Sequence, residues 1–127
     1  MKKEISTNNA PNAIGPYSQA IVFENLIFTS GQLPVDPQTN QIAEGIENQA
    51  HMVLKNLQSV LEAAGSSLDN VLKCTVFLRH LSDFATINEI YGRYVAKPFP
   101  SRSCVEVARL PLDVLIEIEA VAALCDK

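Results

Sequence analysis

The sequence predicts an α+β protein, a two-layer sandwich in which two helices cover one face of a mixed β-sheet. Three observations support this. Two segments carry apolar residues at helical spacing, a pair of short strands precedes the first of them, and the C-terminal stretch alternates as strands do. The expected order of elements is β-β-α-β-α-β-β. With 127 residues, 47% of them hydrophobic and 19% charged, residues 1–127 are expected to form a single domain.

The first half of the chain is expected to hold a hairpin and a long helix. Residues 17–23 and 26–29 are rich in strand formers, and Glu24-Asn25 between them favours a tight turn because Asn tolerates positive φ. From Ile46 to Ala64 the apolar residues form one broad stripe at helical spacing. Gly65 then provides a natural C-terminal stop. Residues 1–16 are polar and turn-rich, and no strand is expected there.

The second half is expected to hold one strand, one helix and two further strands. Residues 71–78 are rich in β-formers, and Asp83 can cap a helix over about 84–95. Prolines at 98 and 100 end that helix. Strands are then expected at about 103–108 and 114–124, joined by a short turn.

The predicted architecture leaves one face of the sheet without a helix. Several residues expected on that face are small or apolar. Because monomeric proteins rarely expose large apolar patches, this face predicts self-association. A closed ring and a two-fold dimer would both satisfy it.

Composition argues against several classes of function. The net charge is −4 and no basic run is present, so nucleic-acid binding is not expected. The cysteines Cys74, Cys104 and Cys125 are widely spaced, and with only His51 and His80 they form no metal-binding pattern. The N-terminus lacks the apolar segment of a signal peptide, and no run could span a membrane. A cytoplasmic location without membrane association is therefore expected.

Arg102 is the sharpest candidate for a functional residue. Alternation places Arg102, Cys104 and Glu106 on one face of the predicted strand. A guanidinium offers paired donors that fit a carboxylate, and Arg102 stands at a strand entrance after a proline-rich stretch. The alternative is a surface arginine paired with Glu106 or Glu117, and spacing alone favours that alternative.

Two other ionisable groups admit two interpretations. Glu117 and Glu119 share one strand face and could supply an acid and a base, although a solvated face is the simpler explanation. Cys104 lies two residues from Arg102, whose charge would favour the thiolate. No histidine lies near in the sequence to act as a base for Cys104.

Four further residues are weaker candidates. Gly31 follows Ser30 at a strand end, where glycine permits a ligand to approach the backbone closely, or simply forms a turn. Tyr17 could cover a pocket or lie at the edge of the core. Asn88 could bind a ligand or be a plain helix residue. From the residues alone, the sequence indicates an oligomeric α+β domain with a candidate carboxylate-binding arginine.

Four segments together resemble the Rid/YjgF family, the reactive intermediate deaminases. They are Ser101-Arg-Ser-Cys-Val-Glu-Val-Ala-Arg-Leu-Pro-Leu-Asp-Val-Leu-Ile-Glu-Ile-Glu-Ala120, Asn9-Ala-Pro-Asn-Ala-Ile-Gly-Pro-Tyr-Ser-Gln19, Thr29-Ser-Gly-Gln-Leu-Pro34 and Asp83-Phe-Ala-Thr-Ile-Asn88. The resemblance spans nearly the whole chain. The segment 95–100 is slightly short before the arginine, which could alter the rim of the site.

The resemblance implies a chorismate-mutase-like fold and a homotrimer with active sites in clefts between subunits. It implies a cofactor-independent 2-iminobutanoate/2-iminopropanoate deaminase, which converts reactive enamines and imines into 2-keto acids and ammonia. An imine is already electrophilic, so neither a metal nor an organic cofactor is expected. The family's carboxylate-binding arginine corresponds to Arg102 and its acidic residue to Glu117. Its pocket-lining positions correspond to Tyr17, Ser30, Gly31, Asn88 and Cys104.

Other functions remain open from the sequence. A non-catalytic trimer that senses small carboxylic acids would use the same Arg102. Some members of the family have been linked to ribonuclease activity or translation inhibition, against which the acidic net charge argues. A chorismate mutase function would rest on likeness of fold alone.

Overall fold

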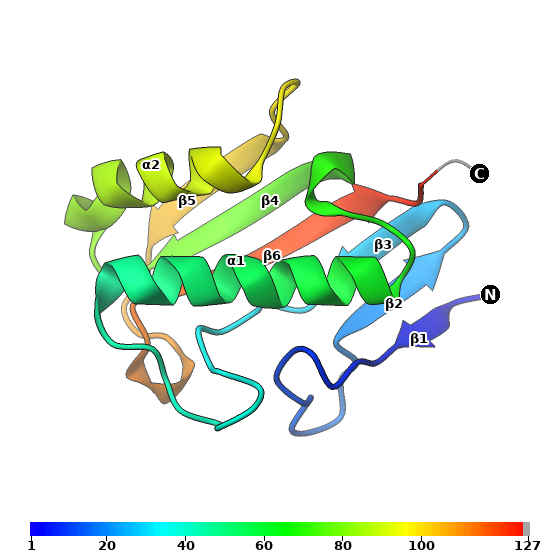
Figure 1. Cartoon of the computed structure of the whole chain (residues 1–127), viewed down its shortest axis with the longest axis horizontal. Coiled ribbons are helices and arrows are strands. Elements are labelled where there is room, and N and C mark those ends of the chain that lie inside the picture. The colour runs from blue at the N-terminus through cyan, green and yellow to red at the C-terminus, as the bar shows by residue number, and fades with distance from the viewer. Residues whose placement is uncertain (126–127) are drawn as a thin grey trace.

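The computed structural model describes residues 1–125 and confirms the two-layer α+β sandwich (Figure 1). A six-stranded sheet carries both helices on one face, and its strand order is β1-β2-β3-β6-β4-β5. The helices are α1 (Gly45–Ala63) and α2 (Phe84–Tyr94). The strands are β1 (Lys3–Ile5), β2 (Ala20–Phe23), β3 (Leu26–Thr29), β4 (Val71–Leu78), β5 (Ser101–Glu106) and β6 (Ile116–Ala123).

Strands β5 and β6 follow one another in the chain but are not neighbours in the sheet. Strand β4 lies between them, antiparallel to β6 and parallel to β5. The helix α2 crosses over between β4 and β5, which is the connection that a parallel pair requires. The expected short turn is a longer connection that includes the 3-10 turn Pro111–Asp113, where Leu112 and Asp113 both adopt positive φ.

Strand β1 was not expected from the sequence. It pairs with the edge of β2, where Ile5 lies opposite Ala20. Ile5 is the only buried residue of this three-residue strand, so it shows no alternating pattern. Strand β2 is also shorter than predicted and begins at Ala20 rather than at Tyr17.

The hydrophobic core fills the space between the helices and the sheet. The apolar stripe of α1 is buried as predicted, and Val53, Leu57 and Val60 belong to the same cluster as Ile116 and Ile118 of β6. Full burial of each such side chain contributes roughly 1.5–3 kcal/mol, so this layer is the main source of stability. Within residues 1–125, no helix is long and apolar enough to cross a membrane.

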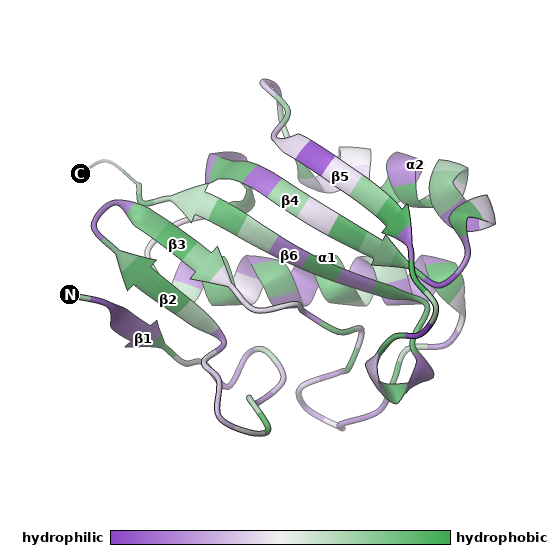
Figure 2. Cartoon of the chain, turned by 180° about the vertical axis from the view of Figure 1, so that it is seen from behind, coloured by the Kyte–Doolittle hydropathy of each residue, from purple (hydrophilic) through white to green (hydrophobic). Residues whose placement is uncertain are grey.

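The opposite face of the sheet has no helix over it, as Figure 2 shows. Strand pairing places both apolar and acidic side chains on this open face. Its exposed large apolar residues are Phe23, Leu26, Phe28 and Val105. The prediction of an uncovered, partly apolar face is therefore confirmed, and self-association through it stays a prediction.

Candidate functional site

The predicted site residues divide into two groups on opposite faces of the sheet. In the register of β4 and β5, Arg102 lies opposite Cys74 and Cys104 lies opposite Val76. Cys74 and Val76 are buried under the helices, so Arg102 and Cys104 belong to the helix-covered face. Glu117 stands between buried core residues of β6 and therefore lies on the open face.

Arg102 lies over two aromatic rings of α2. Its Cζ is 4.8 Å from the ring centroid of Tyr91 and 5.5 Å from that of Phe84. The Tyr91 hydroxyl lies 3.1 Å from Cys74 Sγ, within hydrogen-bond distance. A cavity of about 340 Å³ beside the guanidinium is also lined by Asn88. The structure thus brings Arg102 and Asn88 together, as the family resemblance implies.

The interpretation of Arg102 as an ion-paired surface residue is wrong. Glu106 accepts a hydrogen bond from the backbone N–H of Leu81 at 2.8 Å. Glu117 is on the other face of the sheet. Among residues 1–125, the salt bridges join Arg93 to Glu89 and Arg109 to Asp113, and none involves Arg102. Its half-buried guanidinium can therefore offer its N–H donors to a ligand.

The charge of Arg102 does not, on balance, favour a thiolate at Cys104. Burial raises the pKa of this half-buried thiol, and the nearby charge of Arg102 lowers it only in part. Cys104 packs against the hydrophobic core. It therefore lies near the candidate site as a neutral thiol rather than as a nucleophile.

The second group gathers around Glu117. The chain after β3 runs beside β6, where the Gln32 N–H donates to the Ile118 carbonyl at 2.7 Å. This pairing brings Gly31 against the Glu117 side chain so closely that a Cβ at residue 31 would overlap the carboxylate. Burial raises the pKa of Glu117, and repulsion from Glu119 raises it further.

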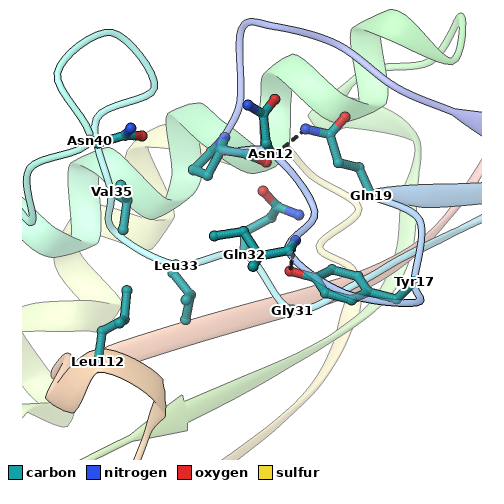
Figure 3. Close-up of a pocket in the computed structure, with 11 residues that line it drawn as sticks. Asn12, Tyr17, Gln19, Gly31, Gln32, Leu33, Val35, Asn40 and Leu112 are labelled. Carbon is teal, nitrogen blue, oxygen red and sulfur yellow. Dashed lines mark hydrogen bonds between the residues drawn. The ribbon is translucent and has the colours of Figure 1, made fainter.

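Tyr17 and Ser30 lie in the same region. Tyr17 is largely exposed and its hydroxyl accepts a hydrogen bond from the Ile14 N–H at 3.3 Å (Figure 3). With Gly31, the Tyr17 ring lines a cavity of about 310 Å³. The Ser30 hydroxyl donates to the Ser18 carbonyl at 2.6 Å, which positions the chain that leads to Gly31.

Two buried amide side chains that the sequence did not single out hold the loops around this cavity. Gln19 accepts from the Thr7 N–H at 2.7 Å and donates to the Pro11 carbonyl at 2.7 Å. Asn56 of α1 donates to the Val35 carbonyl at 2.8 Å. The only sequence signal for Asn56 was its position between apolar residues of a helix that faces the core.

Tyr91 and Phe84 were also missed as parts of the site. Both belong to the apolar stripe of the predicted second helix, where they suggest only core packing. Their contact with Arg102 depends on how α2 and β5 pack, which the helical period does not report. Among residues 1–125, no group of three or more His, Cys, Asp or Glu side chains could hold a metal ion.

A family model described as Endoribonuclease L-PSP matches residues 7–124, nearly the whole chain. This chain belongs to the Rid/YjgF family. Its four family motifs lie on the elements that build the two groups described above, namely the loop before β2, the end of β3, the start of α2 and the strands β5 and β6.

Similar members of the Rid/YjgF family come from archaea and bacteria. A RutC family protein of Pyrococcus horikoshii is 54% identical over 123 residues, which cover 96% of this chain and 98% of that protein. A Salmonella typhimurium protein named 2-iminobutanoate/2-iminopropanoate deaminase is 50% identical over 125 residues, covering 96% and 98%. The crystal structure of Escherichia coli TdcF with bound serine has a TM-score of 0.92 at 47% identity, covering 97% and 99%.

Proposed function

We propose that this Rid/YjgF protein is a hydrolytic deaminase that converts enamines and imines such as 2-aminoacrylate and 2-iminobutanoate into 2-keto acids and ammonia. The observation that carries the proposal is Arg102, a half-buried guanidinium that forms no salt bridge within residues 1–125 and lines a cavity. The deaminase named above, at 50% identity over 125 residues, supports the same reaction.

The active site is formed between two copies of the chain. Within one chain Arg102 and Glu117 lie on opposite faces of the sheet, so they cannot both contact one small substrate. Strand β5 is at an edge of the sheet, and the open face carries exposed apolar side chains. We propose a homotrimer in which Arg102, Asn88 and Cys104 of one copy face Tyr17, Ser30, Gly31 and Glu117 of the next.

Arg102 binds the substrate carboxylate. Two parallel N–H groups of the guanidinium donate to its two oxygens, which fixes both the position and the orientation of the small substrate. The imine carbon is then directed toward Glu117 of the neighbouring copy. These imines also hydrolyse in water unaided, so the enzyme needs to lower the barrier only modestly, and positioning of the substrate supplies a substantial part of that.

Glu117 acts on water and on the leaving nitrogen. The enamine first takes a proton at its terminal carbon and becomes an iminium. Glu117 accepts a proton from water as the water oxygen bonds to the iminium carbon, which gives a carbinolamine. It then returns the proton to the nitrogen. As the C–N bond breaks, the carbinolamine hydroxyl gives its proton to the Glu117 carboxylate and its oxygen becomes the carbonyl, so that ammonia leaves a 2-keto acid. A pKa raised by burial suits both steps, because a carboxyl group whose pKa is moved toward neutral pH can both accept and return a proton. No step requires a metal or organic cofactor.

A coupled assay tests this function. Serine or threonine dehydratase generates the imine, and keto-acid formation is followed with and without the protein, so that the spontaneous rate is subtracted. The wild-type protein should accelerate release, and Arg102→Ala should return it to the spontaneous rate. Equal rates for wild type and Arg102→Ala would remove Arg102 as the carboxylate-binding residue. Full activity of Glu117→Ala would remove the proton-transfer role.

The assay also separates the remaining alternatives. Tight binding of 2-keto acids without any acceleration would favour a regulatory carboxylate-binding trimer. The family model's description names an endoribonuclease, but this chain has a net charge of −4 and no clustered basic run. Ribonuclease activity that persists through repurification and disappears in Arg102→Ala would favour that function instead.

We also propose a cytoplasmic location. The three cysteines are all free thiols, as a reducing compartment would leave them.

A further inference from the structure

The Arg102 Cζ lies over two aromatic rings of α2, 4.8 Å from the ring centroid of Tyr91 and 5.5 Å from that of Phe84. We propose that Tyr91 and Phe84 are positioning residues, which hold the guanidinium plane so that its N–H edge is directed to the substrate carboxylate. The inference rests on the proposed function in one respect, because it takes Arg102 as the residue that binds that carboxylate.

The contacts around Tyr91 fix the orientation of its ring. Tyr91 is 8% exposed, and its hydroxyl lies 3.1 Å from Cys74 Sγ on β4. Cys74 is also the residue directly opposite Arg102 in the parallel pairing of β4 and β5. One sheet position and one helix position therefore determine where the ring lies, 4.8 Å from Arg102 Cζ.

Stacking suits a carboxylate-binding arginine better than an ion pair would. A guanidinium over an aromatic ring is attracted through its face, and its five N–H donors lie in its plane. A protein carboxylate would instead occupy those donors and neutralise the charge. Because Tyr91 is buried, the attraction is less weakened by water than at an exposed site. The rings thus restrict the arginine before substrate arrives, which reduces the entropy lost on binding.

Binding of 2-oxobutanoate, a stable 2-keto acid, tests the positioning role by calorimetric titration. Tyr91→Leu should weaken binding about 3- to 30-fold, the range expected for a cation–π contact. Tyr91→Phe keeps the ring and should recover most of the lost affinity. Tyr94→Leu is the matched control, because Tyr94 lies on the same helix and its hydroxyl bonds His51 Nδ1 at 2.8 Å. It should lower the melting temperature without weakening binding.

A double-mutant cycle separates positioning from general damage. In the Arg102→Ala background, adding Tyr91→Leu should cause no further loss of affinity, because Tyr91 acts through Arg102. An equal loss in both backgrounds would show a purely structural role and overturn the proposal. If Tyr91→Leu does not fold, Phe84→Leu replaces it, since Phe84 is 37% exposed and tolerates substitution better. Unchanged affinity in a folded Phe84→Leu protein would then overturn the proposal.

The two proposals fail in distinguishable ways. Wild-type protein that binds 2-oxobutanoate through Arg102 but does not accelerate imine hydrolysis would contradict the deaminase and leave the positioning role in place. Wild-type protein that accelerates hydrolysis, with a folded Tyr91→Leu variant of unchanged affinity, would contradict the positioning role and leave the deaminase in place.

Discussion

The Glu117 carboxylate packs against the backbone of Gly31, so closely that there is no room for the methyl group of an alanine at residue 31. The contact follows from the pairing of residue 32 with residue 118, which fixes the two chains side by side. Glycine at this position therefore determines where the Glu117 carboxylate lies, the group that we propose transfers protons.

Gly31→Ala should lower deaminase turnover about tenfold or more while costing little stability. The new methyl group forces the Glu117 carboxylate to rotate away, and the end of a glutamate side chain can do so cheaply. The coupled dehydratase assay and a thermal melt measure the two effects. In a Glu117→Ala background the alanine at residue 31 should have almost no further effect. A tenfold loss there as well would place the role of Gly31 elsewhere.

Glu119→Gln should shift the acid side of the pH–rate profile to lower pH. Repulsion from Glu119 is the second cause, after burial, of the raised pKa of Glu117. Glu117 must be ionised to accept a proton from water, so activity rises as pH increases through its pKa. Removing the negative charge of Glu119 lowers the pKa of Glu117, so the rise in activity then occurs at lower pH. An unchanged profile would mean that Glu117 is not the titrating group.

Two inactive variants should restore activity when they share one oligomer. In the proposed homotrimer, Arg102→Ala and Glu117→Ala each damage every site of an unmixed oligomer. After unfolding and refolding together in equal amounts, about a quarter of the interfaces receive an intact Arg102 from one copy and an intact Glu117 from the next. Activity should therefore return to about a quarter of the wild-type level. No recovery, despite confirmed mixing, would contradict a site shared between copies.

Phe28→Glu should separate the proposed homotrimer into monomers and abolish activity. Phe28 is 44% exposed on the open face of the sheet, and a charge there could not be buried between copies. Analytical ultracentrifugation measures the mass. Met52→Glu is the control, because Met52 lies among the residues of α1 that are outside the buried stripe. If the Phe28→Glu protein keeps the wild-type mass, the copies associate through another surface.

Local patterns predicted most of the secondary structure. The predicted bounds of β3 and β4 agree with the structure and those of α1 differ by one residue, because period 2 and period 3.6 are visible in the order of residues. The alternation of β6 also placed Glu117 and Glu119 on the face opposite the core. Strand β1 was not predicted, because its single buried residue, Ile5, shows no alternating pattern.

The two layers, the residue types of the candidate site and the family can all be read from local patterns and motifs in the sequence. The separation of β5 from β6 by β4, and with it the position of Arg102 and Glu117 on opposite faces, depends on the pairing of strands that are distant in the chain. The same is true of the proximity of Tyr91 to Arg102 and of Gly31 to Glu117. The difference is one of distance along the chain. Periodicity reports which way a side chain points from its own element, whereas these contacts depend on which distant elements pair and in what register.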